Sequence, residues 1–192
     1  GSHLDSVAQG GNFDGAAGVV SGLVACAGLR DAGITPPRDI RVMGIRAEES
    51  AWFGVSYIGS RSALGTLPDG ALDDARRADT GRSLADHMAE AGCNPRALRD
   101  GAVFMKPEAL HAYLEVHIEQ GPVLEEAGFP VGVVTGIRGN RRLPNARCVG
   151  EYSHCGGVPR GHRRDAVIAT AELVGALDGI WDQCDADGRD FA

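Results

Sequence analysis

The sequence predicts an α/β protein with a largely parallel sheet, and two observations carry this prediction. Segments with helical spacing of apolar residues alternate with short apolar, β-branched segments along the first 137 residues. Three of the apolar segments are also associated with polar clusters that contain His, Asp or Glu. Such clusters are expected where the carboxyl ends of parallel strands gather ligands at one edge of a sheet.

The individual elements follow from these patterns in chain order. Small and apolar residues recur at helical spacing from Asp14 to Ala32, and Gly33 can end this helix. We expect a buried strand over 40–45, an exposed helix over 73–91, a strand over 113–118, a short helix over 122–127, a strand over 131–137, a strand over 148–152 and a helix over 165–177. The apolar positions of the last helix, which include Ile168 and Leu173, should form its inner side.

The composition of the sequence changes after Ile137, where several arginines flank Gly139-Asn140. We therefore expect a domain boundary near residues 136–140, with a first domain over 1–137 and the beginning of a second over 138–192. Neither end resembles a natural domain end, so the chain is expected to be a fragment of a longer protein.

Composition excludes several classes of partner. The 19 Lys and Arg against 26 Asp and Glu give a net charge of −7, which argues against nucleic acid or an anionic membrane surface as a partner. There is no apolar run of the roughly 18–20 residues that a membrane span needs, and no secretory leader pattern. The five cysteines form no CxxC pair, so reduced thiols and a cytoplasmic location are expected.

The first candidate site combines His3, Asp5 and Asp14. Imidazole and carboxylate groups suit Zn²⁺ and related ions. Asp5 could fix the tautomer of His3, and Asp14, on a glycine-rich turn before a helix, could bridge two metals. Read alone, a His-x-Asp pattern is more often an exposed polar turn.

Two further clusters strengthen the metal hypothesis. Glu48 and Glu49 follow a predicted strand, so one can bind metal while the other acts as a general base on a metal-bound water. His117 lies at the end of another predicted strand. Alone, the glutamate pair is more often a solvated turn and the histidine a structural one, but together the three clusters indicate a metallohydrolase.

Longer motifs then resemble a known family. Gly1-Ser2-His3-Leu4-Asp5 with Gly10-Gly11 and Asp14-Gly15 resembles the first metal motif of the M20-type dinuclear metallohydrolases. The branch containing N-carbamoyl-L-amino-acid hydrolase, ureidopropionase and allantoate amidohydrolase is the most similar. The segments that carry this similarity are Glu48-Glu49-Ser50, Tyr57-Ile58-Gly59-Ser60-Arg61, His117-Ile118-Glu119-Gln120-Gly121-Pro122 and His154-Cys155-Gly156-Gly157-Val158-Pro159.

The resemblance implies a zinc-exopeptidase-like catalytic domain followed by part of an inserted α+β dimerisation domain. It implies two divalent ions, with Zn²⁺ expected and Mn²⁺, Co²⁺ and Ni²⁺ also suited to the ligands. It further implies a homodimer and a small ureido or N-carbamoyl acid as substrate. The implied metal ligands are His3, Asp14, Glu49 and His117, the implied base is Glu48, Asp5 orients His3, Gln120 contacts substrate, and His154 binds substrate and stabilises the oxyanion in the other subunit's site.

Two departures leave alternatives open. The segment after His154 reads Cys-Gly-Gly-Val-Pro-Arg where much of the family has Ala-Gly-Thr-Thr-Pro-Met, which leaves the substrate within the family undetermined. Family members also extend further at both ends, and the last metal ligand lies in the later part, so this chain alone is expected to be nearly inactive. An aminoacylase or dipeptidase of the same superfamily, or a non-catalytic dimerisation module, are the alternative functions.

Overall fold

The structure is a computed structural model and describes residues 1–137 and 145–189. Packing divides the chain into two units, Gly1–Gly128 and Phe129–Ala192, which we treat separately. The domain boundary expected near residues 136–140 falls partly on residues outside the described ranges. Of the helices in the described ranges, none is long and apolar enough to cross a membrane.

The first unit begins with a parallel βαβ arrangement. Strand β1 (Ser2–His3) leads through helix α1 (Ala16–Asp31) to strand β2 (Gly44–Ile45), and Ser2 pairs with Gly44 while His3 pairs with Ile45. Because parallel strands need a crossover connection, α1 fills the role of the crossover helix and packs against β1. This arrangement confirms the α/β class and the first predicted helix, although the predicted strand over 40–45 is reduced to two residues.

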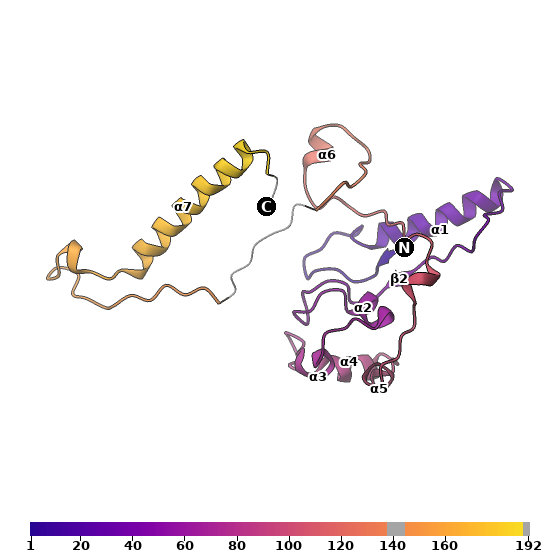
Figure 1. The fold of residues 1–192 in the computed structure, drawn as a ribbon, viewed down its shortest axis with the longest axis horizontal. Helices are drawn as coiled ribbons and strands as arrows, with labels where there is room; N and C mark the ends of the chain where they lie inside the picture. Colours follow the sequence, from indigo (N-terminus) through magenta and orange to yellow (C-terminus); the bar gives the residue numbers. More distant parts are fainter. Residues whose placement is uncertain (138–144, 190–192) are drawn as a thin grey trace. The chain divides into compact units, whose positions relative to one another are not determined.

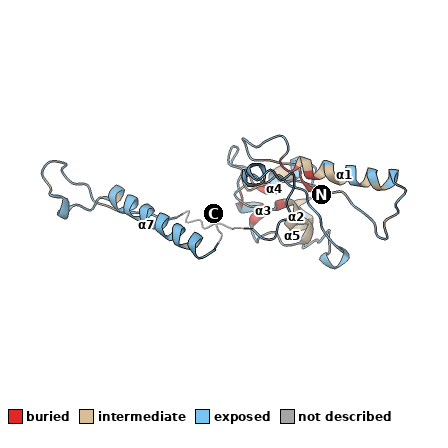
Figure 2. Ribbon diagram, turned by 90° about the horizontal axis from the view of Figure 1, so that it is seen from above, coloured by how far each residue is buried: buried red, intermediate tan, exposed pale blue. Residues whose placement is uncertain are grey.

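Short helices form the rest of the first unit (Figure 1). They are α2 (Ile58–Leu64), α3 (Ala71–Asp74), α4 (Leu84–Glu90), α5 (Pro95–Arg99), a 3₁₀ turn (Pro107–Ala109) and α6 (Val123–Glu126). A small core of Ile58, Leu72, Ala75, Leu84 and Ala85 joins α2, α3 and α4. Figure 2 shows that the buried residues gather in this unit.

The prediction of a single helix over 73–91 was wrong, because the chain forms two separate helices, α3 and α4, in this region. Between α3 and α4 it makes a turn closed by an antiparallel bridge of Arg76 with Ser83. Ser83 then starts α4 through a reciprocal capping box with Asp86, in which each side chain accepts from the other residue's backbone N–H. The predicted end of the helix at residue 91 agrees with the structure to within one residue, since α4 ends at Glu90 and Gly92 follows with a left-handed φ of 79°.

The segments 113–118, 131–137 and 148–152, all within the described ranges, have no regular secondary structure and form no strand. A strand is defined by hydrogen bonds to a neighbour, and these segments have no ladder partner among the described residues. The short helix predicted over 122–127 is confirmed as α6.

The second unit contains a 3₁₀ turn (Arg160–His162) and the long helix α7 (Ala166–Ala186). Asp165 caps α7 by accepting from the N–H groups of Val167 and Ile168 at 2.9 and 3.2 Å. The helix extends nine residues beyond the predicted end at 177. Its predicted inner face is exposed in the described part of the chain, with Ile168 at 51% and Leu173 at 60% (Figure 2).

Candidate metal centre

Glycine positions bring the first helix against the first strand. Gly15 precedes α1 with a φ of 66°, and a Cβ there would lie 2.5 Å from His3 Nδ1. At Gly18 a Cβ would lie 2.2 Å from the carbonyl oxygen of Val116. Only glycine permits both close approaches. They place Asp14, His3 and the segment that carries His117 side by side.

Three side chains converge at this point. The Nε2 atoms of His3 and His117 lie 3.0 Å apart, and each lies 3.4 Å from Asp14 Oδ1. His3 and Asp14 are buried, whereas the His117 side chain is 31% exposed. Together the three ligand atoms form a compact group of imidazole and carboxylate donors.

The opposite edges of both rings face backbone carbonyls. His3 Nδ1 lies 2.6 Å from the carbonyl oxygen of Asp5, and His117 Nδ1 lies 2.8 Å from that of Ile118. Because a carbonyl can only accept, each neutral ring carries its proton on Nδ1. The lone pairs on both Nε2 atoms therefore point into the group.

The arrangement fits a divalent metal ion. Asp14 Oδ1 is buried and has no hydrogen-bond partner among the described residues, so its desolvation is uncompensated. At metal–ligand distances of about 2.0–2.1 Å, tetrahedral ligands lie about 3.3 Å from one another, close to the observed separations. His3, Asp14 and His117 thus have the right residue types and spacing for such an ion, and the Nδ1 tautomers leave both Nε2 lone pairs available.

Glu49 and Gln120 border this group. Glu49 Oε1 lies 3.8 Å from His3 Nε2, and its side chain is a quarter exposed. Gln120 Nε2 donates to Asp14 Oδ2 over 3.4 Å, and Gln120 has a left-handed φ of 59°. Left-handed backbone is uncommon for residues other than glycine and often marks a functional site.

Asp5 contacts the glutamate pair more closely than it contacts His3. Its Oδ1 accepts from the N–H of Glu48 at 3.0 Å and its Oδ2 from the N–H of Glu49 at 2.9 Å. Its carboxylate is 4.0 Å from His3 Nδ1, and the Asp5 backbone carbonyl holds that ring nitrogen instead. Asp5 thus links the end of β1 to the loop that follows β2.

The carboxylate of Glu48 binds a residue that sequence reasoning had given no role. Ser60 donates to Glu48 Oε1 from its N–H and to Glu48 Oε2 from its hydroxyl, both over 2.8 Å. Ser60 lay within a motif of the family resemblance, but nothing in its type or spacing indicated a contact with Glu48.

Burial, followed by the charges of Glu115 and Glu48, raises the pKa of Tyr113 above its ordinary value of 10. The phenol of Tyr113 is therefore neutral at physiological pH.

His154 belongs to the second unit, where it is exposed. Its Nδ1 accepts from the N–H of Gly156 at 3.2 Å, so a neutral ring carries its proton on Nε2. Arg163 stabilises the segment that follows His154 by donating hydrogen bonds to the carbonyl oxygens of Val158 and Cys155.

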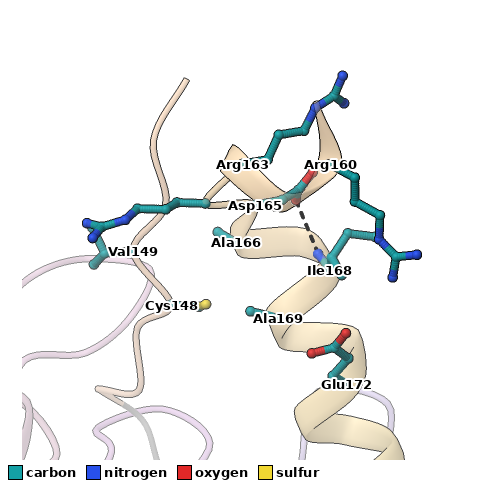
Figure 3. A pocket seen from close by; sticks show the side chains of 10 residues that line it. Cys148, Val149, Arg160, Arg163, Asp165, Ala166, Ile168, Ala169 and Glu172 are labelled. Atoms are coloured by element: carbon teal, nitrogen blue, oxygen red, sulfur yellow. Dashed lines mark hydrogen bonds between the residues drawn. The ribbon is translucent and has the colours of Figure 1, made fainter. Parts of the chain in front are cut away.

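A surface cavity of about 820 Å³ also lies in the second unit, between Cys148-Val149 and the start of α7 (Figure 3). Arg160 and Arg163 line it, but Figure 3 shows their guanidinium groups pointing away from each other. Arg164, also in the lining, pairs with Glu151 at 3.1 Å. The cavity therefore lacks a converging set of cationic groups.

Comparison with known proteins relates the chain to amidohydrolases. It is 44% identical over 178 residues to an N-carbamoyl-L-amino acid amidohydrolase of Geobacillus stearothermophilus, covering 93% of this chain and 42% of that protein. It is 34% identical over 182 residues to an allantoate deiminase of Arabidopsis thaliana, covering 94% and 34%. The chain therefore spans well under half the length of these relatives.

A solved structure is similar over the same range. The crystal structure of a hydantoinase/carbamoylase family amidase from Burkholderia ambifaria matches with a TM-score of 0.70 and 34% identity, covering 93% of this chain and 42% of that one. The sequence model of peptidase family M20/M25/M40 matches residues 1–187. The chain belongs to peptidase family M20/M25/M40.

Proposed function

We propose that this chain contributes the metal-binding part of an amidohydrolase that cleaves the linear C–N bond of N-carbamoyl amino acids or related ureido acids such as allantoate. The observation that carries the proposal is the convergence of His3 Nε2, His117 Nε2 and the unpartnered Asp14 Oδ1. The substrate class follows from the names of the relatives, which act on N-carbamoyl amino acids and allantoate.

Two divalent ions complete the proposed site, with Zn²⁺ favoured over Mn²⁺, Co²⁺ or Ni²⁺. His3, Asp14 and His117 would hold the first ion, while Asp14 and Glu49 would contribute to the second. When bound, the ions supply Lewis-acid polarisation of the scissile carbonyl.

The chain's own residues would then move the protons. Glu48 takes a proton from the water that attacks the carbonyl carbon and returns it to the departing nitrogen as the C–N bond breaks. Asp5 fixes the backbone of the glutamate pair through its two hydrogen bonds. Gln120, beside Asp14, is placed to contact substrate.

The oxyanion that develops on the carbonyl oxygen requires a hydrogen-bond donor. We assign this role to His154, whose tautomer leaves Nε2–H free to donate. In the homodimer that we propose, residues 1–137 form the catalytic part, residues 138–192 belong to the dimerisation domain, and His154 serves the site of the partner subunit. Five free thiols suit the reducing cytoplasm.

Amine release tests the proposal. The longest reading frame that contains this sequence is expressed, stripped of metal, reloaded with Zn²⁺ or Mn²⁺, and given N-carbamoyl amino acids, allantoate and matched dipeptides. We expect metal-dependent amine release from a ureido compound and none from dipeptides. Dipeptide cleavage would instead support a peptidase, and absence of both metal binding and hydrolysis would support a binding module.

A further inference from the structure

The Glu48 carboxylate is held at both of its oxygens by one residue, Ser60. The two donor–acceptor distances of 2.8 Å lie within the range of well-formed hydrogen bonds. Ser60 Oγ also lies 3.3 Å from the carbonyl oxygen of Tyr57, but a carboxylate is the stronger acceptor and is closer. A glutamate bound in this way cannot turn about its last torsion without losing both bonds.

Local structure explains why Ser60 can offer both donors. It is the third residue of α2, where a first-turn N–H has no acceptor within the helix. Glu48 Oε1 supplies that acceptor from a loop 12 positions earlier in the sequence. The backbone of Ser60 therefore binds Glu48 in place of an intrahelical carbonyl.

The start of α2 is also fastened to the backbone of the Glu48 loop. Tyr57 N–H donates to the carbonyl of Glu48 at 2.8 Å, and Ile58 N–H donates to the carbonyl of Ala47 at 2.9 Å. A Cβ at Gly59 would lie 2.2 Å from the Arg46 carbonyl oxygen and 3.1 Å from Glu48 Oε1. The two segments thus meet without space for a side chain between them.

Backbone conformation on both sides of this contact is unusual. Ala47 has a φ of 57° and Tyr57 a φ of 62°, and both residues have a Cβ that disfavours the left-handed region. Such conformations persist where surrounding contacts over-determine them, and they cluster at functional sites. They immediately precede Glu48 and α2, the two elements that Ser60 joins.

We propose that Ser60 is a positioning residue for the Glu48 carboxylate, fixing the direction in which its remaining lone pairs accept a proton. This inference rests on the proposed function, in which Glu48 is the base. Free glutamate side chains have a broad distribution of the last torsion, so a base without Ser60 would spend only part of its time correctly directed.

Three variants separate positioning from simple packing. Ser60→Ala removes the hydroxyl, and Ser60→Thr keeps it. Ser62→Ala is the matched control, because it also removes a serine hydroxyl from α2, but one with no hydrogen-bond partner among the described residues. In the longest reading frame, we expect Ser60→Ala to lower kcat about tenfold, as for loss of one hydrogen bond to a charged group. KM and bound metal should stay within about twofold, and Ser60→Thr and Ser62→Ala should retain kcat.

A second measurement does not depend on turnover. In this chain, amide hydrogen exchange followed by NMR reports the bond from Ser60 N–H to Glu48 Oε1. We expect Glu48→Ala to accelerate exchange at Ser60 about tenfold or more while exchange at Ser62 changes little.

The two measurements distinguish the failures. Unchanged exchange at Ser60 in the Glu48→Ala variant, or an unchanged kcat in Ser60→Ala, would overturn the role of Ser60 even in an active enzyme. Accelerated exchange together with a metal-loaded enzyme that hydrolyses no ureido compound would support the Ser60–Glu48 contact and overturn the proposed function.

Discussion

The Nε2 atoms of His3 and His117 face each other across 3.0 Å, although the two residues are 114 positions apart in the sequence. The Nδ1 atom of each ring is hydrogen-bonded to a backbone carbonyl oxygen. Both Nε2 lone pairs are therefore directed toward Asp14 Oδ1. Three acceptors in contact repel one another unless a cation or proton lies between them. A bound metal ion would relieve this repulsion, which otherwise lowers the stability of the metal-free fold.

Asp14→Asn should have opposite effects on stability and metal binding. The amide removes a buried charge and can donate to an imidazole lone pair, so the metal-free variant should gain about 1–3 kcal/mol in free energy of unfolding. Its Zn²⁺ affinity should fall at least about tenfold. Thermal unfolding and calorimetric titration measure both, with the exposed Asp31→Asn as control. A variant that binds Zn²⁺ as tightly as the parent chain would contradict this assignment.

Asp5→Asn should destabilise the fold by about 1–3 kcal/mol. The amide oxygen can still accept one of the N–H groups of Glu48 and Glu49, but the amide nitrogen would oppose the other. Urea unfolding measures the loss. Asp100→Asn breaks only a surface ion pair with Arg96 and should cost under about 1 kcal/mol. Equal losses in the two variants would mean that the Asp5 bonds contribute nothing.

Glu48→Gln should abolish hydrolysis while leaving bound metal nearly unchanged. The amide keeps the size of the side chain but cannot take a proton from water. We expect kcat to fall at least about 100-fold, measured as amine release by the longest reading frame. If most of the rate remained, Glu48 would not be the base.

Asp86 should contribute to stability only above acidic pH. Hydrogen bonding of the Asp86 carboxylate with the Ser83 side chain, and then with the Ser83 backbone N–H, which donates to Asp86 Oδ2 at 3.1 Å, lowers the pKa of Asp86 below its ordinary value of 3.8. A carboxyl whose pKa is lower in the folded state stabilises the fold above its unfolded pKa, and this contribution is lost as pH falls through the folded pKa. Thermal midpoints of the parent chain and Asp86→Asn should therefore differ at pH 6 and converge once the pH falls well below 3.8, the ordinary pKa of the carboxyl. A difference independent of pH would contradict the carboxylate's role.

Local signals in the sequence predicted the helices best. The helical spacing after Asp14 and the apolar segment before Ala127 correspond to α1 and α6. The helix predicted over 73–91 failed because the capping box of Ser83 and Asp86 starts a new helix within it, a signal that was present in the sequence. Strands over 113–118 and 131–137 depended on partners elsewhere in the chain, and apolar spacing carries no information about pairing.

In the candidate site, too, residue types could be predicted from the sequence, whereas contacts between distant residues could not. Residue types placed His3, Asp14, Glu49 and His117 among metal-binding candidates, and the structure brings their side chains together. The chemistry of Asp5 was harder to foresee, because its backbone carbonyl holds His3 while its carboxylate binds the glutamate loop. Ser60 could not be found from residue type, since a serine near a helix start is common and only the folded chain sets it against Glu48.

Imidazole NMR during a Zn²⁺ titration of this chain tests the metal centre most directly. The chain has six histidines, and we expect saturable shifts at Nε2 of His3 and His117, with Nδ1 of both rings still protonated. The rings of His87, His111 and His162 serve as internal controls and should not respond. Shifts confined to those rings, or no saturable response at His3 and His117, would contradict the account.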